Sequence, residues 1–203
     1  MRKLMVIPMA GLLVLAVAAP VAAGPNVSNS SGTATVAEAY WGSAQNGVQS
    51  SGYISVTREG KGEAFAHFER STGAYVLCEG GEFEGFVGTL MYGFGPATLT
   101  VGTNSTTASA SATVESFSFA VDECDGMWDE QPGDAFDISL DLTAEGPTLR
   151  STSRESFHLP QEFNERYSYR AAFRRATGSA TIDGATLGVD GQIGKVSWSS
   201  HVN

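Results

Sequence analysis

Among the side chains of this 203-residue chain that could do chemistry, the carboxylates form the densest clusters along the sequence. The stretch VDECDGMWDEQPGDAFD, residues 121–137, contains seven of them around one cysteine and one tryptophan, and no Lys or Arg. A second acidic stretch, CEGGEFE, begins at Cys78. If Cys78 and Cys124 form a disulfide, their Cα atoms lie about 5–6 Å apart and the two acidic stretches meet.

A cluster of acidic residues formed in this way has two interpretations. The first is a Ca²⁺ site, because Ca²⁺ takes about six to eight oxygen ligands from flexible loops. The second is a solvated acidic loop, since these acids lack the fixed spacing of a known calcium loop. We favour the solvated loop and expect no cofactor, with Ca²⁺ as the alternative. The candidate ligands are Glu79, Glu82, Asp122 and Asp125.

Motifs of catalysis are missing from the chain, which has no GxSxG, HExxH or P-loop pattern. The histidines His67, His158 and His201 are scattered, and a lone His in a strand is more often a packed or surface residue than a catalyst. A glycosidase needs paired carboxylates with one acid in an apolar pocket. Most acids here fall in loops or at outward positions, so nothing in the sequence requires an enzyme.

Aromatic residues offer a second candidate site, for a ligand rather than a metal. Exposed rings at the ends of strands can stack on a sugar or close over a small apolar molecule. The competing interpretation is that these rings cap the ends of the core. Trp128 is expected to be the most exposed, because its neighbours show no alternation. The candidate residues are Trp41, Tyr92, Trp128 and Trp198.

Charge is distributed unevenly along the chain, whose net charge is −10. Residues 71–149 contain 13 acidic residues and no Lys or Arg, whereas residues 150–175 contain six arginines and three acids. An acidic balance argues against a nucleic-acid partner and leaves the partner unknown. Either the two regions pair, with Arg166, Arg170 and Arg174 facing Asp137 and Asp141, or an acidic face binds a cation or a basic partner.

The N-terminus predicts export. Met1-Arg2-Lys3 precedes a long apolar run, and Val21-Ala22-Ala23 ends it with small residues, as in a cleaved signal peptide over 1–23. We expect a disordered leader over 24–32, a single secreted domain over 33–203 and no membrane span after cleavage. Two cysteines in an exported chain predict one disulfide, Cys78–Cys124.

Alternation of apolar and polar residues predicts β-strands through the body of the chain. Phe136, Ile138, Leu140 and Leu142 follow a period of two, as strand residues do. The apolar positions change parity near Glu115, which predicts a β-bulge there. About ten strands with short connections predict an all-β, antiparallel meander that closes into a barrel-like fold, with a two-sheet β-sandwich as the alternative.

One segment, residues 160–176, fits both a helix and a strand. Phe163, Tyr167 and Ala171 lie at helical spacing, but Tyr167, Tyr169, Ala171 and Phe173 alternate strictly with polar residues. We favour a strand, preceded by one helical turn at 160–164.

Three functions remain open from the sequence. The chain is a secreted, non-catalytic binding domain with an acidic face, a small-ligand carrier with a cavity in the barrel, or a hydrolase or isomerase that uses carboxylates. A filled, dry interior favours the first, and a polar cluster facing a cavity favours the third.

Overall fold

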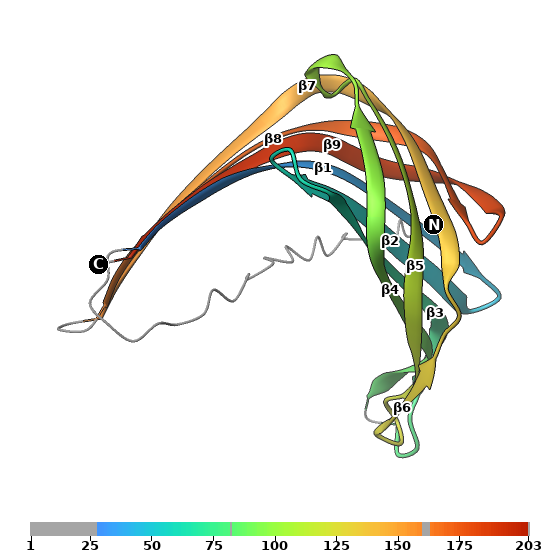
Figure 1. Cartoon of the computed structure of the whole chain (residues 1–203). Helices are drawn as coiled ribbons and strands as arrows, with labels where there is room; N and C mark the ends of the chain where they lie inside the picture. Colours follow the sequence, from blue (N-terminus) through green and yellow to red (C-terminus); the bar gives the residue numbers. More distant parts are fainter. Residues whose placement is uncertain (1–27, 82, 160–162, 203) are drawn as a thin grey trace.

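The computed structural model describes residues 28–81, 83–159 and 163–202. These residues form nine antiparallel strands in one sheet and no α-helix, with one short 3-10 turn at Thr103–Ser105 (Figure 1). The strands are β1 (Ser28–Gln45), β2 (Val48–Glu59), β3 (Ala64–Leu77), β4 (Glu84–Val101), β5 (Thr107–Asp122), β6 (Met127–Pro132), β7 (Phe136–Leu159), β8 (Phe163–Ile182) and β9 (Ala185–Val202). No helix in the described ranges is long and apolar enough to cross a membrane.

The sheet closes on itself. The strand order is β4-β3-β2-β1-β9-β8-β7-β5-β6, and an additional pairing of β4 with β5 completes the ring. The edge of β5 that faces away from β4 pairs with two strands. β7 pairs with residues 107–114 and β6 pairs with residues 117–122. The prediction of a barrel-like antiparallel meander is therefore confirmed, and the sandwich alternative is not needed.

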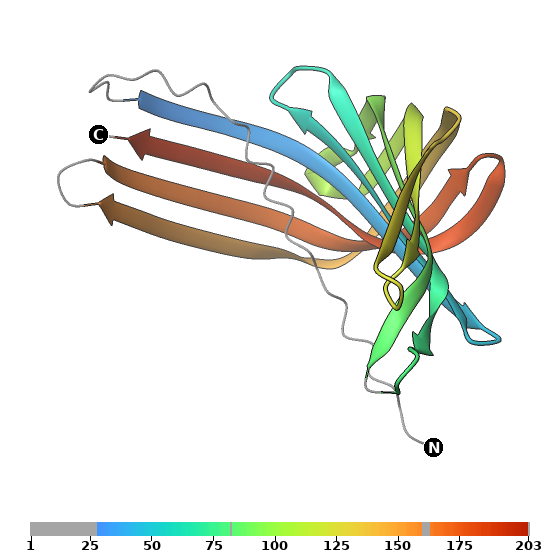
Figure 2. The ribbon, with the colours of Figure 1, turned by 90° about the horizontal axis from the view of Figure 1, so that it is seen from below.

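Four strands run past the neighbours that close the barrel, as the left side of Figure 2 shows. They are the outer parts of β1 (28–35), β9 (195–202), β8 (163–172) and β7 (150–159), which remain paired to one another throughout. We call this four-stranded extension the blade. Residues 150–159 of β7 have no partner strand on their other side among the described residues.

The barrel interior is apolar and filled. The buried core includes Ile54, Phe68, Val114, Leu140 and Ile193, and no described polar or charged residue is buried. The alternating residues of the same strands face outward, where hydroxyls and carboxylates bond across strands, as Ser109 does to Asp141 at 2.6 Å. This separation of faces is what period-two alternation produces when one face of a sheet becomes a core.

Large side chains in this sheet are accommodated by glycine on the facing strand. The indole of Trp41 lies over Gly52, its cross-strand partner, and a Cβ at that position would approach the ring to 2.0 Å. Trp198 lies over Gly32 in the same way. These glycines are required by close approach of a side chain rather than by backbone conformation.

Gly and Pro do not end every strand of this sheet. β3 runs through Gly73, β4 runs through Pro96 and β7 runs through Gly146-Pro147. At Pro96, which has no N–H to donate, pairing with β5 is interrupted and resumes at Ala97. β7 changes its register with β8 between Glu145 and Leu149.

The predicted bulge near Glu115 is absent from the pairing of β5 with β4. On the other side of β5 the pairing is interrupted between Val114, opposite Phe136 of β7, and Phe117, opposite Pro132 of β6, and resumes with the register shifted by one residue. β4 and β5 keep one register on both sides of Glu115. The apolar residues change parity because they change face: Val114 points into the core, whereas Phe117 and Phe119 lie on the outer face. A change of face and a bulge produce the same sequence pattern, and only the pairing distinguishes them.

Two other predictions are settled in part. β8 forms a strand over Phe163–Ile182, so the strand interpretation of residues 160–176 is confirmed where the structure describes them. The helical turn expected at 160–164 falls partly on residues 160–162, outside the described ranges, and residues 163–164 belong to β8. β1 begins at Ser28, so residues 28–32 of the predicted disordered leader form the start of a strand. The predicted signal peptide over residues 1–23 lies outside the described residues.

Candidate functional site

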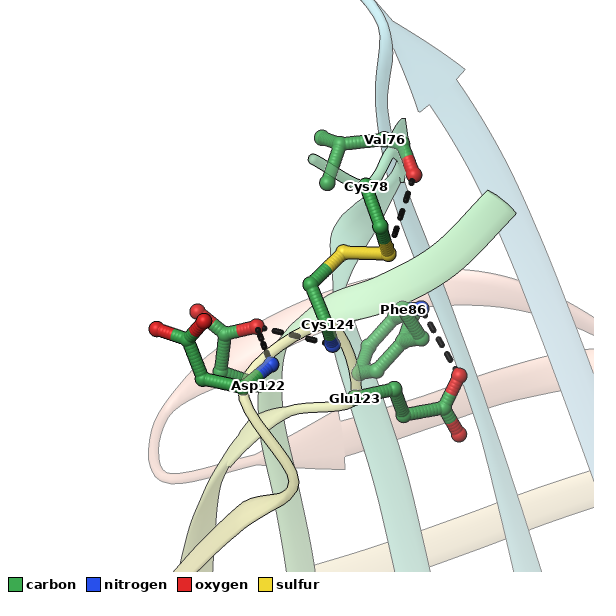
Figure 3. Close-up of a disulfide and its surroundings, with 7 residues drawn as sticks. Val76, Cys78, Phe86, Asp122, Glu123 and Cys124 are labelled. Carbon is green, nitrogen blue, oxygen red and sulfur yellow. Dashed lines mark hydrogen bonds between the residues drawn. A yellow bond between two sulfur atoms is a disulfide. The ribbon is translucent and has the colours of Figure 1, made fainter. Parts of the chain in front are cut away.

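The disulfide joins two neighbouring hairpin ends. Cys78 follows β3 and Cys124 follows β5, with their Cα atoms 5.2 Å apart (Figure 3). Gly85 on β4 leaves room for the bridge, because a Cβ there would lie 2.9 Å from the Sγ of Cys78. The predicted pairing Cys78–Cys124 is confirmed, and such a bridge is typical of proteins in an oxidising, extracytoplasmic compartment.

Two of the acids beside the disulfide bind backbone N–H groups. The Oδ1 of Asp122 accepts hydrogen bonds from the N–H of Cys124 at 3.0 Å and of Asp125 at 3.2 Å. The Oε2 of Glu123 accepts one from the N–H of Phe86 at 2.8 Å, across to β4. These carboxylates shape the turn and tie the two hairpins together, as short acidic side chains do in turns.

The candidate calcium ligands do not converge in the part of the chain that the structure describes. No group of three or more His, Cys, Asp or Glu side chains there has an arrangement that could hold a metal ion. Glu79 and Asp125 are exposed, Asp122 is engaged as above, and Glu82 lies outside the described residues.

Large apolar side chains are exposed where the hairpins are joined. We define the stapled tip as residues 75–86 and 121–130, the ends of the β3–β4 and β5–β6 hairpins that the disulfide connects, at the lower right of Figure 1. Of the eleven exposed large hydrophobic residues in the described chain, six lie here, and the most exposed is Leu77 at 65%. The six are Tyr75, Val76, Leu77, Phe83, Met127 and Trp128.

The sequence of the stapled tip surrounds these apolar residues with acids and no bases. Residues 75–86 and 121–130 together contain eight Asp and Glu residues and not one Lys or Arg. An apolar surface held between carboxylates attracts groups that combine an apolar stem with a positive charge, above all Arg and Lys side chains. The stapled tip is therefore suited to a basic protein surface.

An outward-facing row of stacked rings leads to the stapled tip. Ring centroids lie 6.5 Å apart for Phe65 and Phe94, 6.1 Å for Phe94 and Phe117, and 5.5 Å for Phe117 and Tyr92. The planes of these pairs differ by 26°, 18° and 19°, so neighbouring rings lie nearly parallel, in stacked arrangements. A sugar stacks on a free ring face, which the rings inside this row do not offer.

The structure links two of the four predicted aromatic site residues and separates the other two. Tyr92 contacts Phe119 at 6.1 Å, and Phe119 contacts Trp128 at 6.3 Å, so Tyr92 and Trp128 belong to one surface. Trp128 is 58% exposed. Trp41 instead packs against the core, 6.1 Å from Phe68, and Trp198 is half-buried on the blade.

His67 lies in the same row, stacked on Phe94 at 4.7 Å. Burial lowers the pKa of this imidazole, while Glu69, whose carboxylate oxygen lies 3.1 Å from Nε2, acts in the opposite direction. Desolvation is the larger effect, so His67 is neutral at pH 7. Burial and then Glu69 raise the pKa of Tyr92, which keeps its phenol protonated.

No ligand-sized cavity opens inside the described part of the barrel. The void beside Ile54, Val56 and Leu140 is too small for a water molecule. A larger depression of about 750 Å³ is open to solvent, and its lining is mainly small and hydroxyl residues with one carboxylate, Asp137. That carboxylate accepts a hydrogen bond from Thr113 at 2.6 Å, so the depression offers no pair of acids for hydrolysis.

The expected pairing of Arg166, Arg170 and Arg174 with Asp137 and Asp141 is wrong. Arg174 donates to the carbonyl oxygen of Gly146, at 2.9 Å from its closer nitrogen, and the two aspartates accept from hydroxyls of β5. Among the described residues, the one contact at ion-pair distance is that of His67 with Glu69, whose imidazole partner is neutral at pH 7. The arginines of the blade are on a separate part of the sheet from these aspartates.

Leu77 and Phe83 were missed by sequence reasoning. A signal was available: both are large apolar residues flanking a Gly-rich acidic turn, CEGGEFE, where nothing can bury them. The disulfide brings the hairpin end that contains Met127 and Trp128 alongside theirs.

Comparisons with known proteins give no relative from which a function could be transferred: no protein-family model, curated protein or solved structure matches the chain.

Proposed function

We propose that this chain is a secreted, non-catalytic interaction domain and that the stapled tip is its binding surface. The observation that supports the proposal most is the gathering of six exposed large apolar side chains on two hairpin ends held by one disulfide. Contiguous exposed apolar surface in a folded protein is costly in water and is typical of interaction sites.

The partner in this proposal is a basic protein surface, whose Lys and Arg side chains have apolar stems as well as charge. The acidic residues of the stapled tip attract Lys and Arg and repel acidic partners, which supplies selectivity, and the apolar residues supply affinity. The disulfide fixes both hairpin ends before binding, so less conformational freedom is lost when the partner arrives.

The filled barrel favours this function over the two alternatives. A carrier needs an interior space, and a carboxylate enzyme needs an acid in an apolar pocket; the interior void has no room for water and no described polar residue is buried. Calcium is not part of the proposal, because Asp122 already serves the backbone of the turn.

A pair of short peptides tests the proposal. A labelled peptide of alternating Arg and Leu should bind with saturation in fluorescence anisotropy, and a Glu–Leu peptide of equal length should not. The double variant Leu77→Ser/Trp128→Ser should weaken binding about tenfold or more, because burial of each such side chain contributes about 1.5–3 kcal/mol.

The matched control is Phe65→Ser, since Phe65 is 53% exposed on β3 but lies outside the stapled tip. It should leave binding unchanged. Equal binding of both peptides, or an equal loss in the Phe65 variant, contradicts the proposal.

A further inference from the structure

One face of the blade is strongly basic. On β9, Lys195 has the same parity as the core residue Ile193, so it lies on the face that continues the inner face of the barrel. The strand registers place four arginines on that face with it. The five basic residues are Arg150, Arg154, Arg166, Arg170 and Lys195.

The basic residues form a regular row along the blade. Arg150 and Lys195 both lie opposite Ala172, and Arg170, Arg154 and Arg166 follow on the next three pairs of facing residues. Successive residues on one face of a strand lie about 7 Å apart, so each step along the row adds a positive charge. The remaining described positions of this face are mostly hydroxyls.

Nothing in the described chain neutralises this row. None of the five basic side chains has a hydrogen bond or an ion pair with a described residue. Arg154, Arg166 and Arg170 are exposed. Half of the ten Lys and Arg residues after residue 27 thus lie on one face of a protein whose net charge is negative.

The complementary surface of the same protein lies elsewhere. The stapled tip has eight acidic residues without a base. In Figures 1 and 2 the free end of the blade and the stapled tip lie on different sides of the barrel, so they do not meet within one chain. Two copies can bring them together.

We propose that the basic face of the blade binds the stapled tip of a second copy of this chain. The inference rests on the proposed function, for which it names the partner. Guanidinium groups of Arg166 and Arg170 pair with carboxylates such as Glu79 and Asp125, and they stack on the exposed ring of Trp128.

A second copy fits the charges better than a polyanion does. The chain as a whole has a net charge of −10, which repels nucleic acids and anionic polymers beyond about one Debye length, about 10 Å at moderate salt. A second copy presents its acids next to apolar groups at one tip and keeps the rest of its charge away from the contact.

The contact is head-to-tail, so a pair of copies retains one free blade and one free tip, on different copies. Such heterologous contacts build rings or open chains of copies. Four strands over eight residues cover about 450 Å² per copy, about half the size of a standard interface. The association is therefore weak and salt-sensitive, and it grows with protein concentration.

Sedimentation of the exported protein, at concentrations up to about 1 mM, tests the inference. The weight-average mass should rise with concentration and fall back when NaCl is raised from about 0.05 M to about 0.5 M. The blade variant Arg166→Glu/Arg170→Glu and the tip variant Glu79→Lys/Asp125→Lys should each weaken self-association about tenfold or more.

Mixing the two variants makes the test specific. The tip variant retains the wild-type blade, and the blade variant retains the wild-type tip, but their partner surfaces are reversed in sign. Because a wild-type tip and a wild-type blade are both present in an equimolar mixture, the mixture should associate under conditions where neither variant associates alone. Arg70→Glu/Arg175→Glu, with the same charge change away from the basic face, should associate like the wild type.

Three results would overturn the inference: a wild-type protein that stays monomeric throughout, association that the blade variant leaves intact, or a mixture that forms no dimer. Binding of polyphosphate to a monomeric wild type, lost in the blade variant, would assign the basic face to a polyanion instead. The Arg–Leu peptide separates the two proposals, because a tip that binds it without self-association retains the proposed function and loses only this partner.

Discussion

At the scale of single residues, His67 shows how burial and a neighbouring charge oppose each other. Desolvation favours the neutral imidazole, and Glu69 at 3.1 Å favours the charged one, with burial the larger effect. The folded pKa therefore lies below the ordinary value of 6.5, near which the unfolded chain titrates. Between those two values the unfolded state binds more protons, so stability rises with pH there.

We therefore predict that His67 contributes fully to stability above pH 6.5 and that this contribution is lost as the pH falls towards its folded pKa. An NMR titration should place its pKa below the ordinary value of 6.5. In urea unfolding, His67→Phe should show a smaller loss of free energy between about pH 7 and about pH 5 than the wild type. A folded pKa at or above the ordinary value would mean that Glu69, not burial, dominates.

The residue scale also marks where sequence reasoning stops. Trp41 and Trp128 are the same type of residue, yet Trp41 packs on the core and Trp128 is 58% exposed. The information that separates them is in their partners: Gly52 faces Trp41 across the ladder, whereas Trp128 follows a turn at a sheet end. Cross-strand partners depend on register, which a local pattern does not contain.

At the scale of elements, alternation was sufficient for the all-β class and for a strand within residues 160–176, where β8 begins at Phe163, and the short connections were sufficient for the antiparallel order. Alternation was insufficient for length, because β4 passes through Pro96 and β7 passes through Gly146. β4 continues since its neighbour on the other side keeps pairing, as Phe65 does with Pro96. In β7 the pairing with β8 is interrupted after Glu145 and resumes at Leu149 with a shifted register. The disulfide followed from cysteine count alone, whereas the apolar surface that it assembles needed the three-dimensional arrangement.

The disulfide itself is a structural element whose removal can be predicted. The double variant Cys78→Ser/Cys124→Ser opens a loop with a sequence separation of 46 residues. The chain-entropy account gives a loss of about 4 kcal/mol in the free energy of unfolding, measured by urea at equilibrium. The far-UV circular dichroism should remain that of a β-protein, because β4 and β5 stay paired from Val87 to Val101.

The same variant should also weaken binding of the Arg–Leu peptide, since the two hairpin ends of the stapled tip are no longer held together. Loss of stability with unchanged peptide binding would show that the hairpins keep their arrangement without the bridge.

At the scale of the whole molecule, the two faces of one continuous sheet have different compositions. The inner face becomes a dry core within the barrel and a basic surface on the blade, with no break in the strands between them. The outer face supplies hydroxyl pairs, the aromatic row and the approach to the stapled tip. Closing eight of the nine strands into a ring buries the core, and the extra length of four of those eight, β1, β7, β8 and β9, exposes the blade.

A filled barrel has a measurable consequence. Phe68 is the largest side chain with no exposed surface, and it contacts rings on two other strands, Trp41 and Phe136. Phe68→Ala should lower the free energy of unfolding by about 3–5 kcal/mol, because close-packed neighbours collapse only partly into the space left behind. Phe65→Ala, on the outer face of the same strand and 53% exposed, should lose much less, about 0.5 kcal/mol.

Urea unfolding of both variants, at equal slope against denaturant, makes the comparison direct. The comparison also bears on function, because a carrier barrel would already contain space next to Phe68 and would lose little on truncation. Similar, small losses for the two variants would therefore reopen the carrier hypothesis, whereas a large loss confined to Phe68→Ala leaves the outer surfaces as the parts of this protein available to a partner.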